Sequence, residues 1–296
     1  MFDKVLIANR GEIAVRINRA CQELGISTVA IHSEADADSM HVRIADESVC
    51  IGPNPVNKSY LNAHAIISAC EITGAQAVHP GYGFLSENAS FAKMLDDHKL
   101  TFIGPKYKHI NMMGDKIQAK KIMQEYGVPT VPGSKEAVVD LKDALNTSKN
   151  IGFPVLLKAS AGGGGRGMKV VHDEKELTNA LPIIKQEALS FFGNDSIYIE
   201  KFIDSPRHIE IQVICDSHNN FLHLHERDCS IQRRNQKVIE EALAPEIDQA
   251  NKDKLFKICT DAMAKMGYLG LGTLEFLFAD NEFYFMEMNT RLQVEH

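Results

Sequence analysis

The feature that most constrains the fold is an alternation of strand-like and helix-like segments over the first hundred residues. Apolar, β-prone runs predict strands at residues 4–8, 27–32, 48–51, 77–79 and 101–103. Between the first two, apolar residues recur on one helical face up to Gly25, and another helix is predicted over about 62–73. Because strand–helix–strand units place their strands side by side in the same direction, we expect a parallel sheet flanked by helices.

A different pattern follows residue 114 and indicates a second domain. Asp115 can cap a helix over residues 116–126, and the proline- and glycine-containing residues 129–134 are typical of a linker. Further predicted elements are helices at 141–149, 174–189 and 249–266 and strands at 155–158 and 168–172. Five more strands, at residues 197–203, 209–214, 221–225, 273–278 and 283–288, are expected to form one antiparallel sheet. The expected fold class is therefore α/β followed by α+β.

Composition excludes several classes of protein. The 296 residues carry 32 Lys and Arg against 39 Asp and Glu, a net charge of −7, so the overall field repels nucleic acids and anionic membranes. The apolar runs are far shorter than the roughly 18 residues of a membrane span, and the N-terminal residues lack a secretory signal pattern. The six cysteines are scattered singly. We therefore expect a cytoplasmic protein that binds neither nucleic acid nor membrane.

The most unusual stretch is the glycine-rich loop at residues 161–167. Its four consecutive glycines lose much chain entropy on folding, which is understandable if a ligand must approach the backbone closely. No helix follows and the Lys-Ser/Thr pair of a P-loop is missing, so a flap between two strands is favoured. Its backbone N–H groups can wrap phosphate oxygens, with Lys158, Arg166 and Lys169 supplying positive charge. The alternative is a surface hairpin without a ligand.

Two glutamates in the last predicted hairpin point to a metal ion. With a turn centred on Asp280, Glu275 faces Phe285 and lies diagonal to Glu287, whose face Asn289 shares. Phe283 and Phe285 would share that face and other large apolar side chains would line the opposite one, so we expect both faces of the hairpin to be buried. Two carboxylates there cannot both stay ionised without a cation, and oxygen ligands suit Mg²⁺ that bridges to phosphates. The alternative is an exposed edge strand that carries glutamate by chance.

The final residues form a polar run. If the last strand continues, Arg291, Gln293 and Glu295 point the same way and could together hold a small planar oxyacid and remove its proton. By itself this pattern also fits a salt-bridged strand. The lone His208 is more typical of a structural role, and the basic residues 232–237 are typical of a solvated loop.

Together these motifs resemble the biotin carboxylases, which have the ATP-grasp fold. The resemblance spans the whole chain and rests on Ile7-Ala-Asn-Arg-Gly-Glu-Ile13, His79-Pro-Gly-Tyr-Gly-Phe-Leu-Ser-Glu-Asn88, Met113-Gly-Asp-Lys116, Lys158-Ala-Ser with the glycine loop, Pro206-Arg-His-Ile-Glu-Ile-Gln212, Glu226-Arg-Asp-Cys-Ser230 and Glu287-Met-Asn-Thr-Arg-Leu-Gln-Val-Glu-His296. It implies a Rossmann-like pre-ATP-grasp domain over residues 1–113 and an ATP-grasp domain over 114–296, with a small lid subdomain over about 133–203. Since the family continues well beyond residue 296, we expect an N-terminal fragment with an incomplete ATP-grasp domain and biotin site.

The resemblance also implies roles for individual residues. ATP would be bound by Lys116, Lys158, Gly164, Gly165, Glu200, Lys201, Phe202, Ile203, His208, Gln232 and Asn235. Mg²⁺, or Mn²⁺ in its place, would be held by Glu275, Glu287 and Asn289. Bicarbonate would be bound by Lys237, Arg291, Gln293, Val294 and Glu295, among which Glu295, Arg291 and Lys237 would be catalytic. Many relatives have histidine at Asn235, although an amide can still donate and accept hydrogen bonds. Arg16, Arg19 and Glu23 match positions of dimer contacts.

The implied activity is the ATP- and bicarbonate-dependent carboxylation of biotin, the first half-reaction of acetyl-CoA carboxylase in fatty acid biosynthesis. Glu295 would deprotonate bicarbonate, which attacks the γ-phosphate to give carboxyphosphate. The implied partners are the biotin carboxyl carrier protein, the carboxyltransferase and a second copy in a homodimer. Two alternatives remain open: another bicarbonate-using ATP-grasp ligase, and a nucleotide-binding module without catalysis.

Overall fold

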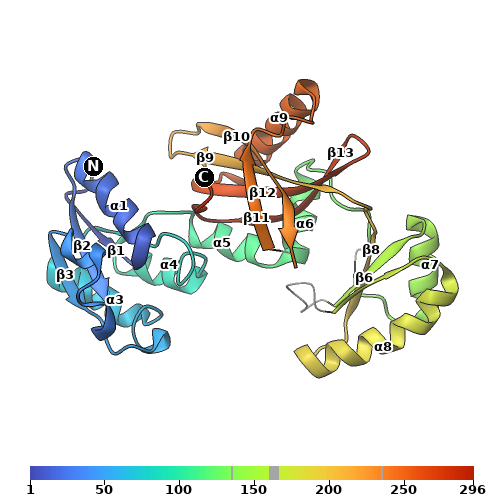
Figure 1. The fold of residues 1–296 in the computed structure, drawn as a ribbon, viewed down its shortest axis with the longest axis horizontal. Coiled ribbons are helices and arrows are strands. Elements are labelled where there is room, and N and C mark those ends of the chain that lie inside the picture. Colours follow the sequence, from blue (N-terminus) through green and yellow to red (C-terminus); the bar gives the residue numbers. More distant parts are fainter. Residues whose placement is uncertain (135, 160–166, 235) are drawn as a thin grey trace.

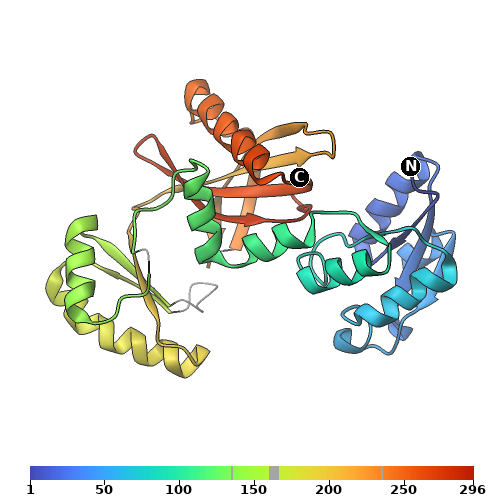
Figure 2. The same cartoon turned by 180° about the vertical axis from the view of Figure 1, so that it is seen from behind.

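The computed structural model describes residues 1–134, 136–159, 167–234 and 236–296, apart from the side chains of Ile117 and Phe192. The described strands form three sheets, two of five strands and one of three. Figure 1 shows them along the longest axis, with the N-terminal sheet at one end, a large sheet in the middle and the small sheet at the other end. Figure 2 shows the same order from behind. None of the described helices is long and apolar enough to cross a membrane.

The N-terminal sheet has the strand order β3-β2-β1-β4-β5, and its adjacent strands are parallel. The strands are β1 (Lys4–Ile7), β2 (Ser27–His32), β3 (Glu47–Cys50), β4 (Ala77–His79) and β5 (Thr101–Phe102), and the helices are α1 (Gly11–Glu23), α2 (Met40–Arg43), α3 (Ala63–Thr73) and α4 (Ala89–Asp97). Alternate residues of β1 belong to two hydrophobic clusters, because successive side chains of a strand point to opposite faces. The predicted parallel sheet with helices on its faces is confirmed.

Two helices near the end of this part were not predicted, namely α4 and α5 (Tyr107–Gly114). The start of α4 carries a recognisable capping signal, since the Asn88 side chain accepts a hydrogen bond from the backbone N–H of Phe91 at 2.8 Å. With α6 (Lys116–Glu125), helix α5 connects the N-terminal sheet to the large sheet (Figure 1).

The small sheet is antiparallel, with the order β7-β6-β8. Its strands are β6 (Val155–Ala159), β7 (Met168–Val171) and β8 (Ile197–Lys201), and its helices are α7 (Leu141–Ile151) and α8 (Glu174–Phe192). The prediction that β8 belongs to the large sheet was wrong. Ile197 and Ile199 instead complete a separate core with β6, α7 and α8, a choice of partner that strand alternation alone does not determine.

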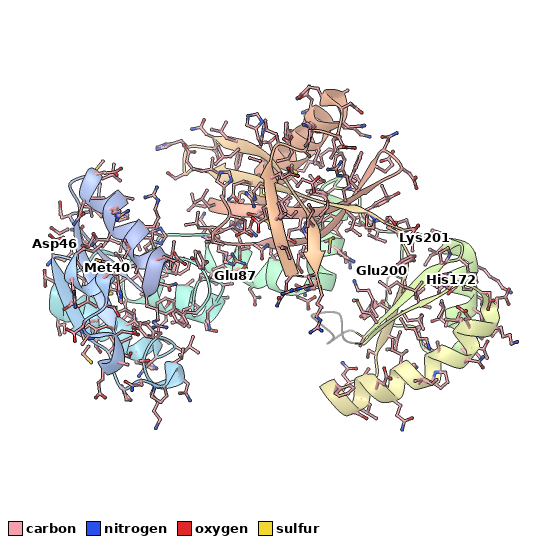
Figure 3. The ribbon with its side chains drawn as sticks, viewed as in Figure 1. Met40, Asp46, Glu87, His172, Glu200 and Lys201 are labelled. Carbon is pink, nitrogen blue, oxygen red and sulfur yellow. The ribbon has the colours of Figure 1, made fainter. Side chains whose placement is uncertain are left out.

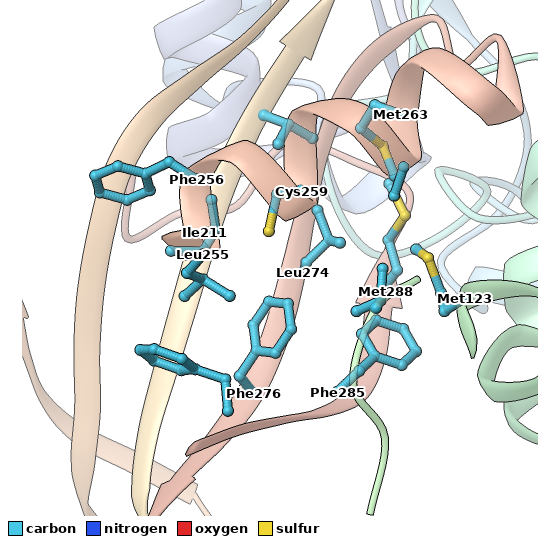
Figure 4. Close-up of a cluster of buried hydrophobic side chains, with 14 of the residues drawn as sticks. Met123, Ile211, Leu255, Phe256, Cys259, Met263, Leu274, Phe276, Phe285 and Met288 are labelled. Atoms are coloured by element: carbon cyan, nitrogen blue, oxygen red, sulfur yellow. The ribbon is translucent and has the colours of Figure 1, made fainter. Parts of the chain in front are cut away.

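The large sheet is antiparallel, with the order β11-β10-β9-β12-β13. Its strands are β9 (Arg207–Cys215), β10 (Phe221–Arg233), β11 (Gln236–Ala242), β12 (Gly270–Ala279) and β13 (Glu282–Asn289). Helix α9 (Gln249–Met266) packs on one face and, with Met123 of α6, closes the core shown in Figure 4. The basic run 232–237 was predicted as a solvated loop, yet β10 ends and β11 begins within it.

The hairpin β12–β13 differs from the predicted register. Asp280 and Asn281 form a two-residue turn with φ of +51° and +60°, so Ala279 pairs with Glu282. Left-handed Asp and Asn are favoured in such turns because their twist matches that of the strands. A bulge then shifts the pairing between Glu275 and Phe276, so the predicted pairing of Glu275 with Phe285 was wrong.

The bulge also decides which side chains share a face. Phe283 and Phe285 point into the core, whereas Glu287 pairs directly with Glu275 on the opposite face, because one extra residue in a strand reverses the alternation beyond it. The prediction that these phenylalanines lie beside Glu287 was therefore wrong. The prediction that both faces of the hairpin are buried was also wrong, since the Glu287 side chain is 32% exposed.

Candidate active site

One face of the large sheet carries an aligned row of charged side chains. Arg227 of β10 pairs with Glu210 of β9, Glu210 with Glu275 of β12, and Glu275 with Glu287 of β13. Glu210 and Glu275 are buried. The opposite face of these strands forms the hydrophobic core, so alternation along each strand assembles the row.

A second row lies two residues along the strands. Gln212 pairs with Thr273, and Thr273 pairs with Asn289. The Thr273 hydroxyl donates to Gln212 Oε1 at 2.8 Å, and Asn289 Nδ2 donates to Glu275 Oε1 at 2.5 Å. The two rows therefore form one polar surface.

Three basic side chains neutralise the buried glutamates. His208 Nε2 lies 3.1 Å from Glu210 Oε1 and 2.9 Å from Glu275 Oε2. Lys237 Nζ contacts Glu210 and lies 3.4 Å from Glu275 Oε1, and Arg227 Nη2 donates to Glu210 Oε2 at 2.8 Å. The carboxylates can therefore remain ionised away from water.

The pKa values of these groups follow from burial and pairing. Burial raises the pKa of Glu210, but hydrogen bonds from His208, Lys237 and Arg227 outweigh this and lower it to about 2. Burial lowers the pKa of His208, while its hydrogen bonds to Glu210 and Glu275 raise it to about 9. The pKa of Lys237 is likewise lowered by burial but raised more strongly by Glu275 and Glu210. His208 is thus a charged member of the site, not the isolated structural histidine that was favoured.

The strand does not continue past Asn289, so the condition for Arg291, Gln293 and Glu295 to point the same way is not met. Arg291 Nη2 lies 3.4 Å from Asn289 Oδ1, and Lys237 Nζ lies 3.4 Å from Glu295 Oε1. Gln293 accepts a hydrogen bond from Arg227. The three polar side chains nevertheless join the same network through separate contacts. Val294, by contrast, is 67% exposed.

Helix α6 connects this network to the small sheet. Lys116 Nζ lies 2.5 Å from Glu287 Oε2, and Lys120, four residues later on the same helix face, pairs with Glu200 of β8. Glu200 Oε2 also accepts from Lys158 Nζ of β6 at 3.1 Å. Burial raises the pKa of Glu200, but the charges of Lys120 and Lys158 lower it below its ordinary value.

The predicted nucleotide-binding residues fall into different places. Lys201 Nζ donates to the carbonyl oxygens of Gly152 and Phe153, and the backbone N–H of Phe202 donates to Pro154. Ile203, the last residue of this predicted segment, is partly exposed. The Lys201 side chain therefore has a structural role within the small sheet.

The remaining predicted nucleotide contacts lie elsewhere. Gln232 Nε2 lies 2.9 Å from His208 Nδ1, so these two side chains contact each other beside the carboxylates. Gly164, Gly165 and Asn235 lie outside the described residues.

Two sets of side chains could hold a divalent ion. The ligand atoms of His208, Glu210 and Glu275 lie within 4.8 Å of one another, but the Glu210 carboxylate is already paired with both Arg227 and Lys237. The predicted set of Glu275, Glu287 and Asn289 consists of oxygen donors on paired strands. Among the ion pairs of the described residues, Glu287 contacts only Lys116, whose side chain is 66% exposed. The second set fits Mg²⁺, which prefers carboxylate and carbonyl oxygens.

Sequence reasoning missed several members of the network. Glu210 and Arg227 are buried among the site residues, and Lys120 joins the two sheets. The alternation of His208, Glu210 and Gln212 along one strand, and the four-residue spacing of Lys116 and Lys120, were the available signals. The position of Arg227 depends on the pairing of β9 with β10, for which the sequence carries no comparable signal.

Comparisons with known proteins agree with this geometry. Residues 1–110 match the family model of the biotin carboxylase N-terminal domain, and residues 115–296 match that of the carbamoyl-phosphate synthase L chain ATP-binding domain. The whole chain is 56% identical to biotin carboxylase of Pseudomonas aeruginosa and spans 66% of the length of that relative.

Solved structures give the same result. All of this chain aligns with 67% of a biotin carboxylase of Campylobacter jejuni in complex with β,γ-ATP, with 50% identity and a TM-score of 0.90. It also aligns with 65% of the biotin carboxylase domain dimer of Hydrogenobacter thermophilus 2-oxoglutarate carboxylase, in complex with MgADP, ADP and bicarbonate, with 49% identity and a TM-score of 0.88. The chain therefore belongs to the biotin carboxylase family, with a biotin carboxylase N-terminal domain followed by an ATP-binding domain of the carbamoyl-phosphate synthase L chain type.

Proposed function

We propose that the protein carboxylates biotin on a carrier protein, using ATP and bicarbonate and passing through carboxyphosphate. The observation that carries the proposal is the single network in which the Glu275–Glu287 pair contacts Lys116 on one side and Lys237 with Glu295 on the other. This network places groups suited to a triphosphate next to groups suited to a small oxyanion. The similar biotin carboxylase domain of Hydrogenobacter thermophilus, solved in complex with MgADP, ADP and bicarbonate, supports the assignment.

We propose a domain division at residues 113 and 114, with residues 133–203 as a lid over the nucleotide. The separate hydrophobic core of the small sheet supports a subdomain there. Residues 129–134 connect the sheets by backbone hydrogen bonds, since Phe285 N–H donates to Pro129 and Lys201 N–H donates to Pro132. Because this short segment joins two separate hydrophobic cores, it suits a hinge between them.

In the proposed nucleotide site, Lys116 and Lys158 bind phosphate oxygens. Both lysines pair with glutamates, at 2.5 Å and 3.1 Å, and each can exchange that partner for a phosphate. Gly164, Gly165, Glu200, Lys201, Phe202, Ile203, His208, Gln232 and Asn235 complete the proposed site. Mg²⁺ held by Glu275, Glu287 and Asn289 would supply positive charge to the phosphates during transfer.

In the proposed bicarbonate site, Arg291, Lys237, Gln293 and the backbone at Val294 hold the anion. Glu295 accepts the bicarbonate proton, and the freed oxygen attacks the γ-phosphorus as the bond to ADP breaks. Lys237 stabilises the charge of Glu295 before the transfer and of the oxyanion during it. Arg291 contributes a planar fork that matches the planar anion.

In the second stage, carboxyphosphate breaks down to CO₂ and phosphate. Phosphate takes the proton of the biotin ureido nitrogen, and that nitrogen attacks CO₂ to form carboxybiotin. The proposed partners are a biotin carboxyl carrier protein, a carboxyltransferase and a second copy of the chain. We place the enzyme in the cytoplasm, where ATP is available and six free cysteines stay reduced.

The test is ADP release with Mg-ATP, for this chain and for a version extended to the length of its relatives, called here the full-length protein. We expect release by the full-length protein to require bicarbonate and to rise several-fold with biotin. Release that needs bicarbonate but not biotin would instead indicate another bicarbonate-using ligase, an alternative favoured by the carbamoyl-phosphate synthase type of residues 115–296. Binding of Mg-ATP without any release would indicate a nucleotide-binding module.

A further inference from the structure

Glu87 belongs to the N-terminal part of the chain, residues 1–114, which contains the parallel sheet. Its carboxylate contacts Thr290 and Arg291, in the segment that follows β13. Glu87 Oε2 accepts a hydrogen bond from Arg291 Nε at 2.9 Å, and Glu87 Oε1 accepts from the backbone N–H of Thr290 at 2.9 Å and from its hydroxyl at 3.3 Å. Figure 3 labels Glu87 where the N-terminal part meets the large sheet. The proposed bicarbonate site therefore has a neighbour more than 200 residues away in sequence.

The loop that carries Glu87 is held at both ends. Asn9 Nδ2 donates to the carbonyl oxygens of Pro80 at 2.7 Å and Tyr82 at 2.8 Å, and Asn88 caps helix α4. Glu87 lies directly before this cap, so its backbone has little freedom. A carboxylate presented in this way can hold a partner in one orientation.

The bond from Arg291 to Glu87 determines which part of the guanidinium remains available. Arg291 Nη1 donates to the Leu292 carbonyl at 3.1 Å, and Nη2 donates to Asn289 Oδ1 at 3.4 Å. A guanidinium has five N–H groups, so these bonds and the bond of Nε to Glu87 leave one N–H on each terminal nitrogen. Glu87 therefore occupies the Nε side and leaves the remaining N–H of each terminal nitrogen for an oxyanion.

Packing leaves space beside Arg291. A cavity of about 230 Å³ lies between the loop and the segment, and its lining includes His79, Ser86, Thr290 and Arg291. A side chain beside such a space has fewer van der Waals contacts to define its rotamer. The hydrogen bonds to Glu87 are then the main constraint from the N-terminal part.

We propose that Glu87 is a positioning residue that orients Arg291 for bicarbonate binding. This inference rests on the proposed function, in which Arg291 binds bicarbonate. It gives the N-terminal part a role in the bicarbonate site, although no side chain of that part is assigned to touch the anion.

The test compares Glu87→Gln with Glu87→Asp and with the control Glu71→Gln, which changes an exposed carboxylate on α3. Steady-state ADP release by the full-length protein is measured while bicarbonate and ATP are varied separately. We expect Glu87→Gln to raise the KM for bicarbonate about tenfold, as for loss of a hydrogen bond to a charged group, with kcat within about twofold and the KM for ATP unchanged. Glu87→Asp should recover part of this loss, and the control should match the wild type.

Three results would overturn the proposal: an unchanged bicarbonate KM in Glu87→Gln, an equal rise in the KM for ATP, or a lowered melting temperature with normal kinetics. If Glu87→Gln does not fold, the KM of Glu87→Asp for bicarbonate is used instead. A raised KM supports the proposal and an unchanged KM overturns it. A wild type without bicarbonate-dependent turnover would contradict the proposed function itself. In that case the line broadening of ¹³C-bicarbonate by the protein tests Glu87 separately. We expect Glu87→Gln to broaden the line less than the wild type does, and equal broadening by the two proteins would overturn the inference.

Discussion

At the scale of single residues, the site depends on carboxylates that differ in how completely they are paired. Glu210 contacts His208, Lys237 and Arg227, and removal of such a partner leaves a buried charge uncompensated. Glu287 is more exposed and pairs with Lys116. The predicted hairpin indicated Glu275 and Glu287, and the family resemblance implied the full set with Asn289. Neither could distinguish a structural carboxylate from one available to a metal ion.

We predict that Glu287→Gln weakens Mg-dependent nucleotide binding about tenfold or more, because one charged ligand of the ion is lost. The melting temperature without ligand should change by only about 2 °C, as for a surface substitution. Calorimetric titration with Mg-ADP and thermal unfolding measure the two effects, and Glu282→Gln on the exposed end of the same strand is the control. A loss of ligand-free stability as large as the loss of binding would show that Glu287 is a structural residue.

Another residue-scale prediction concerns pH. Asp36 is buried in the N-terminal part and accepts hydrogen bonds from Tyr60 at 2.6 Å, Arg10 at 2.7 Å and Ser33 at 3.2 Å. Burial raises the pKa of this carboxyl, but the hydrogen bonds from these partners have the larger effect, so the pKa lies below its ordinary value. Burial and the bond to Asp36 raise the pKa of Tyr60 to about 12, so Tyr60 remains a donor at neutral pH.

Because the folded pKa of Asp36 lies below the unfolded value, its stabilising contribution is present above about pH 4 and is lost as the pH falls through the folded pKa. Asp36→Asn should therefore reduce the free energy of unfolding at pH 7 by about 2 kcal/mol and by less at pH 3. Denaturant unfolding at both pH values measures this, with Asp38→Asn, an exposed neighbour, as the control. An equal effect of Asp36→Asn at the two pH values would contradict the account.

At the scale of elements, boundaries could be predicted better than partners. The helix predicted at residues 249–266 is α9 with the same bounds, and the structure shows Asp248 capping its start and Gly267 ending it. The register of β12–β13 was wrong because a two-residue turn and a bulge both change it, and neither is encoded in the alternation of apolar residues. A register shift of one residue turns every side chain of a strand to the opposite face. An error of that size therefore changes which side chains are predicted to lie at the site.

Helix α6 illustrates how one element serves two sheets. Its Lys120 pairs with Glu200, which also holds Lys158. In Lys120→Gln, Lys158 is the remaining lysine of the two that pair with Glu200. Because Glu200 no longer shares its charge with Lys120, it binds Lys158 more strongly and keeps Lys158 from a phosphate. We predict that ATP affinity falls about tenfold, the effect of one hydrogen bond to a charged group. Equilibrium binding of a fluorescent ATP analogue measures this, and Lys121→Gln, which is exposed on the same helix, should bind normally. Equal affinities of the two variants would contradict this role.

At the scale of the whole molecule, separate hydrophobic cores hold separate groups of elements. The parallel N-terminal sheet could be predicted because strand–helix alternation leaves few topologies. The division of the antiparallel strands between two sheets could not, since the buried faces of β8 and β9 have similar apolar patterns. The site is formed where α6, the large sheet and residues 290–296 meet, and such long-range proximity has no local signal in the sequence.

The central claim is that Glu275, Glu287 and Asn289 hold the divalent ion that binds the nucleotide. The most direct measurement is an anomalous diffraction experiment on crystals of the protein with Mn²⁺ and a non-hydrolysable ATP analogue. We predict a manganese peak bound by oxygens of these three side chains and of the triphosphate. A peak bound instead by His208, Glu210 and Glu275 without phosphate oxygens, or no peak at either set in the presence of bound nucleotide, would contradict the claim.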